Sequence, residues 1–193
     1  MNEALQTDER LENSGSHAGK GENILKIAVK KIAAAAMMTA LTVAMSGFAV
    51  PIGASRCYPV QHLVNVVCAV FLGPVCGVMT AFSASLIRNL MGTGSLLAFP
   101  GSMVGAFLCA MVYKKTGRLW LTYLGEMTGT GILGGMLCFP VATLIMGREA
   151  ALFTYVIPFL MSTACGTVMA AILMGALEKS HAFDYLKNIL EAG

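Results

Sequence analysis

Charged residues are scarce in this sequence of 193 residues. Asp, Glu, Lys and Arg make up only 12% of it, whereas apolar residues make up 56% and the mean hydropathy is +0.73. A soluble domain of this length cannot hide so much hydrocarbon in one small core. The composition therefore excludes an ordinary soluble domain and predicts an integral membrane protein.

Signatures of enzymes are also missing. The sequence has no H-E-x-x-H zinc motif, no G-x-S-x-G nucleophile elbow and no paired acidic cluster for a metal. The stretch GSHAGKG at 15–21 has too short a spacing for a phosphate loop and lacks the following Ser or Thr, so it cannot support ATP hydrolysis. We therefore expect neither an enzyme nor a cofactor. The net charge of only +3, with basic residues spread along the chain, also argues against a nucleic-acid surface.

The cysteines form no C-x-x-C pair and no regular zinc spacing. Five of the six fall inside predicted helices, where free cysteine behaves as a small apolar packing residue. Only Cys57 has polar neighbours. With His62 it would provide two metal ligands without a third, so we predict no metal site.

Short Gly, Pro or charged breaks divide the apolar part into six predicted helices, over 24–50, 59–72, 74–91, 100–114, 119–146 and 150–178. The first apolar run carries no charge from 32 to 52, which is enough to cross about 30 Å of hydrocarbon at about 1.5 Å per residue. We therefore interpret it as an uncleaved anchor instead of a signal peptide. The second and fourth helices look short, which predicts irregular segments over 53–59 and 92–101 that line a cavity.

The predicted fold is all-α, a bundle of six transmembrane helices over residues 24–180. A polar tail over 1–23, expected to be disordered, precedes it, and a short tail over 181–193 follows it. Eight Lys and Arg residues fall on the side of this arrangement that holds both tails, and three fall on the other side. Because such residues favour the cytoplasmic side, we expect both tails in the cytoplasm and the bundle in the plasma membrane.

Polar residues at membrane depth are costly and usually face a cavity or a partner. Gln61, His62 and Asn65 fall on one face of the second helix, which predicts a polar pocket wall. Two alternatives stay open: Arg88 pairs with Glu126 or extends to the interface, and His62 binds a backbone carbonyl. The complete set of candidate ligand-binding residues is Arg56, Tyr58, Gln61, His62, Asn65, Arg88, Asn89, Thr93, Phe99, Glu126 and Thr130.

Small residues recur at every fourth position in several predicted helices. Ala36, Ala40 and Ala44 share one face of the first helix, and glycine pairs such as Gly101/Gly105 and Gly125/Gly129 repeat the pattern. Such spacing allows close helix contact. Most of these contacts are expected inside the bundle, whereas the alanine stripe could also face another protein.

Several longer stretches resemble the ThiW family, and the resemblance covers nearly the whole membrane part. They include PIGASRCYPVQH from residue 51, LIRNLMGTG from 86, LAFPGSM from 97 and GEMTGTG from 125. The resemblance implies a substrate-binding S component of an energy-coupling factor (ECF) transporter, which takes up the thiazole precursor of thiamine. It also implies a transmembrane coupling subunit and two cytoplasmic ATPase subunits as partners, and it favours the alanine stripe as the contact with the coupling subunit.

Other functions stay open from the residues alone. An S component for another small vitamin or precursor would need a similar pocket. A stand-alone secondary carrier would be expected to show inverted repeats and several buried carboxylates, but only Glu126 lies well inside the predicted span. A structural subunit would not need the polar cluster.

Overall fold

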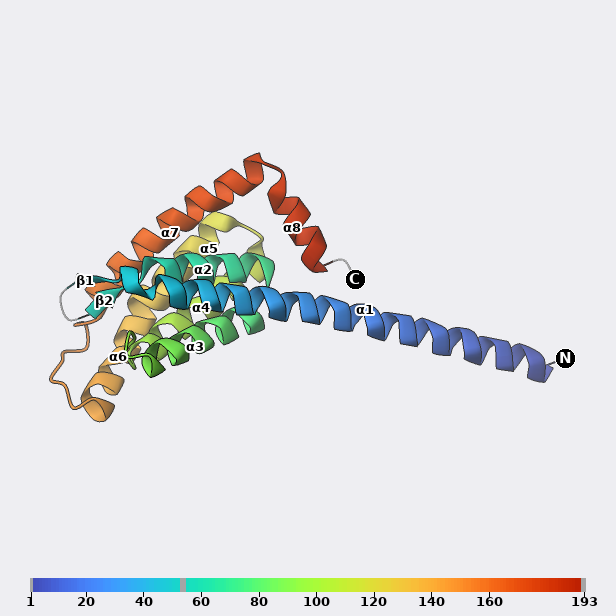
Figure 1. The fold of residues 1–193 in the computed structure, drawn as a ribbon, viewed down its shortest axis with the longest axis horizontal. Coiled ribbons are helices and arrows are strands. Elements are labelled where there is room, and N and C mark those ends of the chain that lie inside the picture. The colour runs from blue at the N-terminus through green and yellow to red at the C-terminus, as the bar shows by residue number, and fades with distance from the viewer. Residues whose placement is uncertain (1, 53–54, 192–193) are drawn as a thin grey trace.

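The computed structural model describes residues 2–52 and 55–191, which are mostly helical. Its helices pack side by side into a bundle, with a small β-hairpin at one end and a long N-terminal helix that projects from the other (Figure 1). The elements are, in chain order, α1 (Asn2–Ala44), η1 (Met45–Phe48), β1 (Val50–Ile52), β2 (Ser55–Cys57), α2 (Pro59–Phe71), α3 (Pro74–Leu90), α4 (Ala98–Thr116), α5 (Leu119–Glu126), η2 (Met127–Gly134), α6 (Gly135–Pro140), η3 (Val141–Ile145), α7 (Val156–Lys179) and α8 (Ala182–Glu191).

The predicted helix ranges agree with these elements to within a few residues at most ends, because Pro and Gly mark many of the boundaries. Pro59 and Pro74 begin α2 and α3 at the position where a helix tolerates proline, and Gly117 ends α4 with a positive φ of 63°. Several differences are corrections. The fourth helix is not short, since α4 has 19 residues. The hairpin β1–β2 and helix α8 were not predicted.

The first helix differs most from its predicted range. It begins at Asn2 instead of residue 24 and ends at Ala44, followed by the short 3-10 helix η1. Its N-terminal part projects away from the other helices (Figure 1). Most helical stability in proteins comes from tertiary packing, and this part of α1 projects away from the helices it could pack on. The disorder expected for residues 1–23 in solution therefore stays a prediction.

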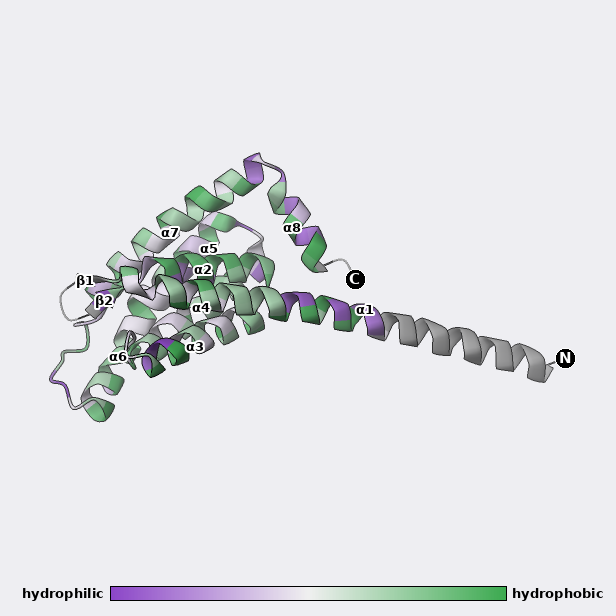
Figure 2. Ribbon diagram, in the orientation of Figure 1, coloured by the Kyte–Doolittle hydropathy of each residue, from purple (hydrophilic) through white to green (hydrophobic). Residues whose placement is uncertain are grey.

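Among the residues that the structure describes, three helical stretches are long and apolar enough to cross a membrane: Gly21–Phe48, Leu119–Ile145 and Val156–Lys179. Most of the bundle ribbon is hydrophobic or near neutral, and hydrophilic residues mark α1 where it leaves the bundle, the end of α3 and the turn between α7 and α8 (Figure 2). The chain is therefore a membrane protein. Six membrane crossings remain a prediction, because α2 is an apolar helix of only 13 residues.

The fifth predicted helix is continuous from Leu119 to Ile145 but contains two π-helical stretches, η2 and η3. Glycines bring η2 against α4. A Cβ added to Gly129 would lie 2.8 Å from the Cα of Gly105, and one added to Gly134 would lie 2.8 Å from the Cα of Gly101. The predicted small-residue seams are thus confirmed here, and they leave no room for a side chain at Gly129 or Gly134.

Candidate functional site

A cavity of about 420 Å³ lies at the end of the bundle that carries the hairpin. This volume is typical of small-molecule sites, which occupy roughly 300–1,000 Å³. The lining comes from β1 and β2, from α2, α3, α4, η2 and α7, and from the loops before α4 and α7. Its polar lining residues are Arg56, Tyr58, Gln61, His62, Arg88, Ser95, Ser102, Thr130, Arg148 and Ser162.

Helix α2 turns the predicted polar face toward the interior. Gln61, His62 and Asn65 are only 3%, 6% and 1% exposed. Gln61 Nε2 donates to Asn65 Oδ1 across one helical turn at 3.2 Å. Because an unbonded polar group at this depth costs free energy, each of these side chains needs partners from other helices.

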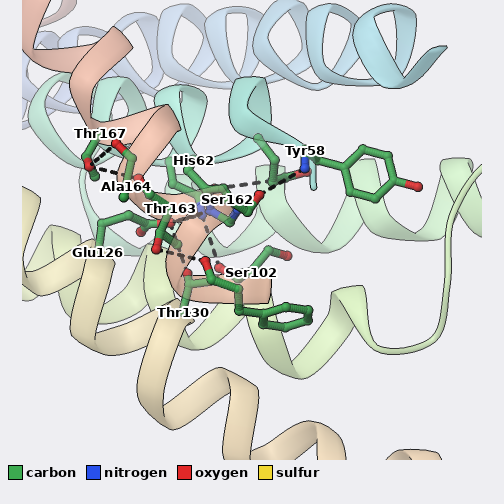
Figure 3. Close-up of polar contacts among 12 residues, drawn as sticks. Tyr58, His62, Ser102, Glu126, Thr130, Ser162, Thr163, Ala164 and Thr167 are labelled. Atoms are coloured by element: carbon green, nitrogen blue, oxygen red, sulfur yellow. Dashed lines mark hydrogen bonds and ion pairs between the residues drawn. The ribbon is translucent and has the colours of Figure 1, made fainter. Parts of the chain in front are cut away.

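Glu126 lies at the end of α5 and is fully buried. It is the acceptor for two of these α2 side chains and for Thr130 of η2. Its Oε1 accepts hydrogen bonds from Asn65 Nδ2 at 2.9 Å and Thr130 Oγ1 at 3.0 Å, and it lies 2.9 Å from His62 Nδ1 (Figure 3). Since Oε1 is an acceptor, His62 donates from Nδ1. The π-helix η2 begins at the next residue, and such irregular turns occur frequently at functional sites.

The other side of the His62 ring contacts Ser162 of α7. His62 Nε2 lies 3.1 Å from Ser162 Oγ, which in turn accepts the backbone N–H of Tyr58 at 2.9 Å. In a neutral ring that donates from Nδ1, Nε2 accepts the hydroxyl hydrogen of Ser162. A chain of hydrogen bonds therefore runs from α7 through His62 to Glu126 (Figure 3).

Arg88, near the end of α3, is 1% exposed and lines the same cavity. Its Nη1 donates to Gln61 Oε1 at 2.9 Å, and its guanidinium carbon lies 3.8 Å from the centre of the Tyr58 ring. The Tyr58 hydroxyl donates to the Thr93 carbonyl at 2.7 Å, which fixes the ring. Arg88 does not extend to the membrane interface, because it is buried. It does not pair with Glu126 either, since that carboxylate contacts His62 instead.

Six of the predicted site residues line the cavity: Arg56, Tyr58, Gln61, His62, Arg88 and Thr130. The other five lie behind the lining or beside it. Asn65 and Glu126 belong to the hydrogen-bond network described above. Asn89 donates to the carbonyls of Ser85 and Ser95. The carbonyl of Thr93 accepts a hydrogen bond from the Tyr58 hydroxyl. The ring of Phe99 packs on that of Phe82, with their centroids 5.6 Å apart.

Sequence reasoning missed several lining residues, including Ser102, Arg148, Phe159 and Ser162. Serine in a membrane helix often bonds to its own backbone, so Ser102 and Ser162 carry little signal in a sequence. Phe159 lines the cavity, whereas the predicted Phe99 does not. Arg148 was counted only in the division of Lys and Arg between the two sides, although its loop lies beside the cavity.

Gly166 allows α7 to approach α2 closely enough to form the site. A Cβ at this position would overlap the carbonyl oxygen of Pro59 and lie 2.6 Å from the Cβ of His62. The spacing between Ser162 and His62 thus depends on the absence of a side chain at Gly166.

The site offers hydrogen bonds and positive charge. Within the described residues, no group of three His, Cys, Asp or Glu could hold a metal ion. Cys57, the metal ligand considered from the sequence, instead donates through Sγ to the carbonyl of Pro158 at 3.5 Å. The arrangement can therefore orient a small polar molecule through neutral donors and acceptors and a buried guanidinium.

Comparison with known proteins gives one family match. The model of the thiamine-precursor transporter proteins (ThiW) matches residues 32–180. No curated protein and no solved structure matches the chain. The matched range contains every residue that lines the cavity.

Proposed function

The chain belongs to the ThiW family of thiamine-precursor transporter proteins, and on this basis we propose that it is the substrate-binding subunit of an ECF-type importer for hydroxyethylthiazole. The family consists of transporters and not of enzymes. A polar cavity of about 420 Å³ at one end of the bundle is the observation that carries the proposal.

The lining suits a small heteroaromatic alcohol. Phe159 and Tyr58 offer ring surfaces for the thiazole, and Ser162 and Gln61 offer hydrogen bonds to its ring nitrogen and hydroxyl, with Ser162 held in place by His62. The contacts of Glu126 with His62, Asn65 and Thr130 hold the α2 face in place before a ligand arrives. Such preorganisation lowers the entropic cost of binding. Binding itself would need no ATP.

The alanine stripe supports a partner on α1. Ala36, Ala40 and Ala44 are all exposed, and they line an apolar groove of about 1050 Å³ between α1 and α3. An internal seam would instead bury these residues. Small side chains let another helix approach closely, so we assign this face to the transmembrane coupling subunit, which would work with two ATPase subunits.

The arrangement of the ends supports a topology with both termini in the cytoplasm. Helix α8 and the projecting part of α1 lie at the same end of the bundle, where Lys30 Nζ donates to the carbonyl of Ile189 at 3.2 Å. The hairpin and the cavity lie at the opposite end. In this topology six crossings of the plasma membrane place the cavity toward the outside, where it can capture its ligand.

Two other functions remain candidates. An S component for a different small vitamin would use the same cavity with another ligand. A stand-alone secondary carrier would couple transport to an ion, but Glu126 is the one buried carboxylate among the described residues, and its Oε1 already has three partners.

Uptake of labelled hydroxyethylthiazole separates these possibilities. The chain would be expressed in cells that lack ECF subunits, alone or together with a coupling subunit and ATPases. We expect accumulation only with the complete set. Accumulation by the chain alone in proteoliposomes with an imposed ion gradient would instead establish the carrier.

A further inference from the structure

We propose that the ligand in this cavity carries a negative charge, as a carboxylate or a phosphate ester, which binds to Arg88. The inference rests on the proposed function, because it specifies the charge class of the thiamine precursor that occupies the same cavity. Hydroxyethylthiazole itself is neutral, so the charged form would be its phosphate ester or a thiazole carboxylate.

The first argument is the incomplete pairing of Arg88. This side chain is 1% exposed, yet no Asp or Glu forms an ion pair with it among the described residues. Among the described residues, its guanidinium contacts the neutral side chains of Gln61 and Tyr58. Its Nε is buried without any hydrogen-bond partner. A buried charge is costly unless it is paired, so an anion is the missing component.

The second argument is the sign of the charge around the cavity. Three arginines line it, Arg56, Arg88 and Arg148, whereas no Asp or Glu from the described part of the chain does. Glu126 lies behind His62 and Thr130, both of which contact it. Arg56 and Arg148 are exposed, so they lie at the mouth of the cavity, and Arg88 lies deeper. A cavity lined by one sign of charge attracts ligands of the other.

The third argument is that Arg88 is held in one orientation. The Tyr58 ring covers one face of the guanidinium, and Gln61 binds Nη1. Tyr58 is itself fixed by its hydrogen bond to the Thr93 carbonyl. A guanidinium held in this way presents its remaining N–H groups as a fork that matches a carboxylate or a phosphate. A purely structural role would not require the charge.

Calorimetric titration of the purified full-length chain in nanodiscs of neutral lipid tests the inference. Four probes are used: hydroxyethylthiazole, its phosphate ester, a methylthiazole carboxylate and inorganic phosphate. We expect at least one charged thiazole to bind about tenfold or more tightly than the neutral alcohol, equivalent to about 1.4 kcal/mol. Comparing the two charged thiazoles identifies whether the group is a carboxylate or a phosphate.

Arg88→Gln should remove this preference, and Arg88→Lys should retain part of it. Arg118→Gln is the matched control, because it removes an equal charge from an exposed arginine at the other end of the bundle. If Arg88→Gln fails to fold, the ratio of affinities in the parent protein and in Arg88→Lys still decides the question.

Two results separate failure of the inference from failure of the proposed function. If the neutral alcohol binds the parent as tightly as both charged thiazoles, the inference is wrong and the proposed function stands. If no thiazole binds, the proposed function fails, and inorganic phosphate then decides the charge class. If the parent binds phosphate and Arg88→Gln does not, the inference of an anion site at Arg88 stands. If the parent does not bind phosphate, the inference is wrong.

Discussion

His62 Nδ1 and Glu126 Oε1 lie 2.9 Å apart, although 64 residues separate them in the sequence. The contact joins α2 to the point where α5 passes into the π-helix η2. Both side chains are buried, so neither can exchange its partner for water. The pair therefore couples the position of a cavity-lining residue to the packing of the bundle.

Replacing Glu126 should destabilise the protein. Glu126→Ala leaves His62, Asn65 and Thr130 without their common acceptor, and we expect a loss of about 1–3 kcal/mol in unfolding free energy. Glu126→Gln keeps an acceptor oxygen and should cost less. Thermal unfolding in detergent measures the effect, with Glu149→Ala at an exposed position as the control. Equal unfolding midpoints for the two alanine variants would contradict the role of Glu126.

Removing the Ser162 hydroxyl should weaken ligand binding more than it affects stability. Ser162→Ala deletes a group that lines the cavity and contacts His62 Nε2. The expected loss of about 1–3 kcal/mol corresponds to roughly a five- to two-hundred-fold lower affinity. Ser180→Ala, an exposed hydroxyl beyond α7, is the matched control. An unchanged dissociation constant for Ser162→Ala would remove this residue from the proposed site.

The polar wall on α2 could be predicted from the sequence, because the spacing of Gln61, His62 and Asn65 is a local property of one helix. The partners of these residues could not. Glu126, Ser162 and Arg88 come from three other helices, and their distances depend on how glycines set the packing. The pairs Gly101/Gly105 and Gly125/Gly129 indicated close helix contact, but not that Gly105 and Gly129 meet each other or that η2 is π-helical.

Helices whose boundaries are marked by proline or glycine could likewise be predicted from the sequence, whereas the irregular parts of the fold could not. Proline at the starts of α2 and α3 marks those boundaries directly. The hairpin β1–β2 has only three residues in each strand, too few to produce a recognisable alternation. Phe99 was expected in an irregular segment beside the cavity, but it lies in α4, and Phe159 on α7 lines the cavity instead.

Adding a methyl group at Gly166 should distort the site. In Gly166→Ala the new Cβ meets the Pro59 carbonyl and His62, so α7 must move away from α2 at a cost of about 1–3 kcal/mol. Ligand affinity should fall with it, because Ser162 moves away from His62. Gly175→Ala tests the same helix at a position with open space around it, and it should leave both unfolding and binding unchanged. A parent-like Gly166→Ala would show that the two helices are not in close contact.

Enlarging the alanine stripe should separate binding from uptake. Ala40→Trp fills the groove between α1 and α3 and should abolish uptake in cells that contain the coupling subunit, while the isolated protein still binds its ligand. Met37→Trp places the same side chain on another exposed part of α1, outside the groove, and should be tolerated. Equal loss of binding and uptake in Ala40→Trp would identify the stripe as part of the internal packing.

The central claim is that this chain alone, without ATP, binds a thiazole precursor of thiamine in the cavity at the hairpin end of the bundle. The most direct measurement is a calorimetric titration of the purified protein with hydroxyethylthiazole and its charged analogues in the absence of nucleotide. We predict saturable binding of one ligand per chain that weakens in His62→Ala and Ser162→Ala. Failure of every thiazole to bind the folded protein, or equal affinity in the parent and both variants, would contradict the claim.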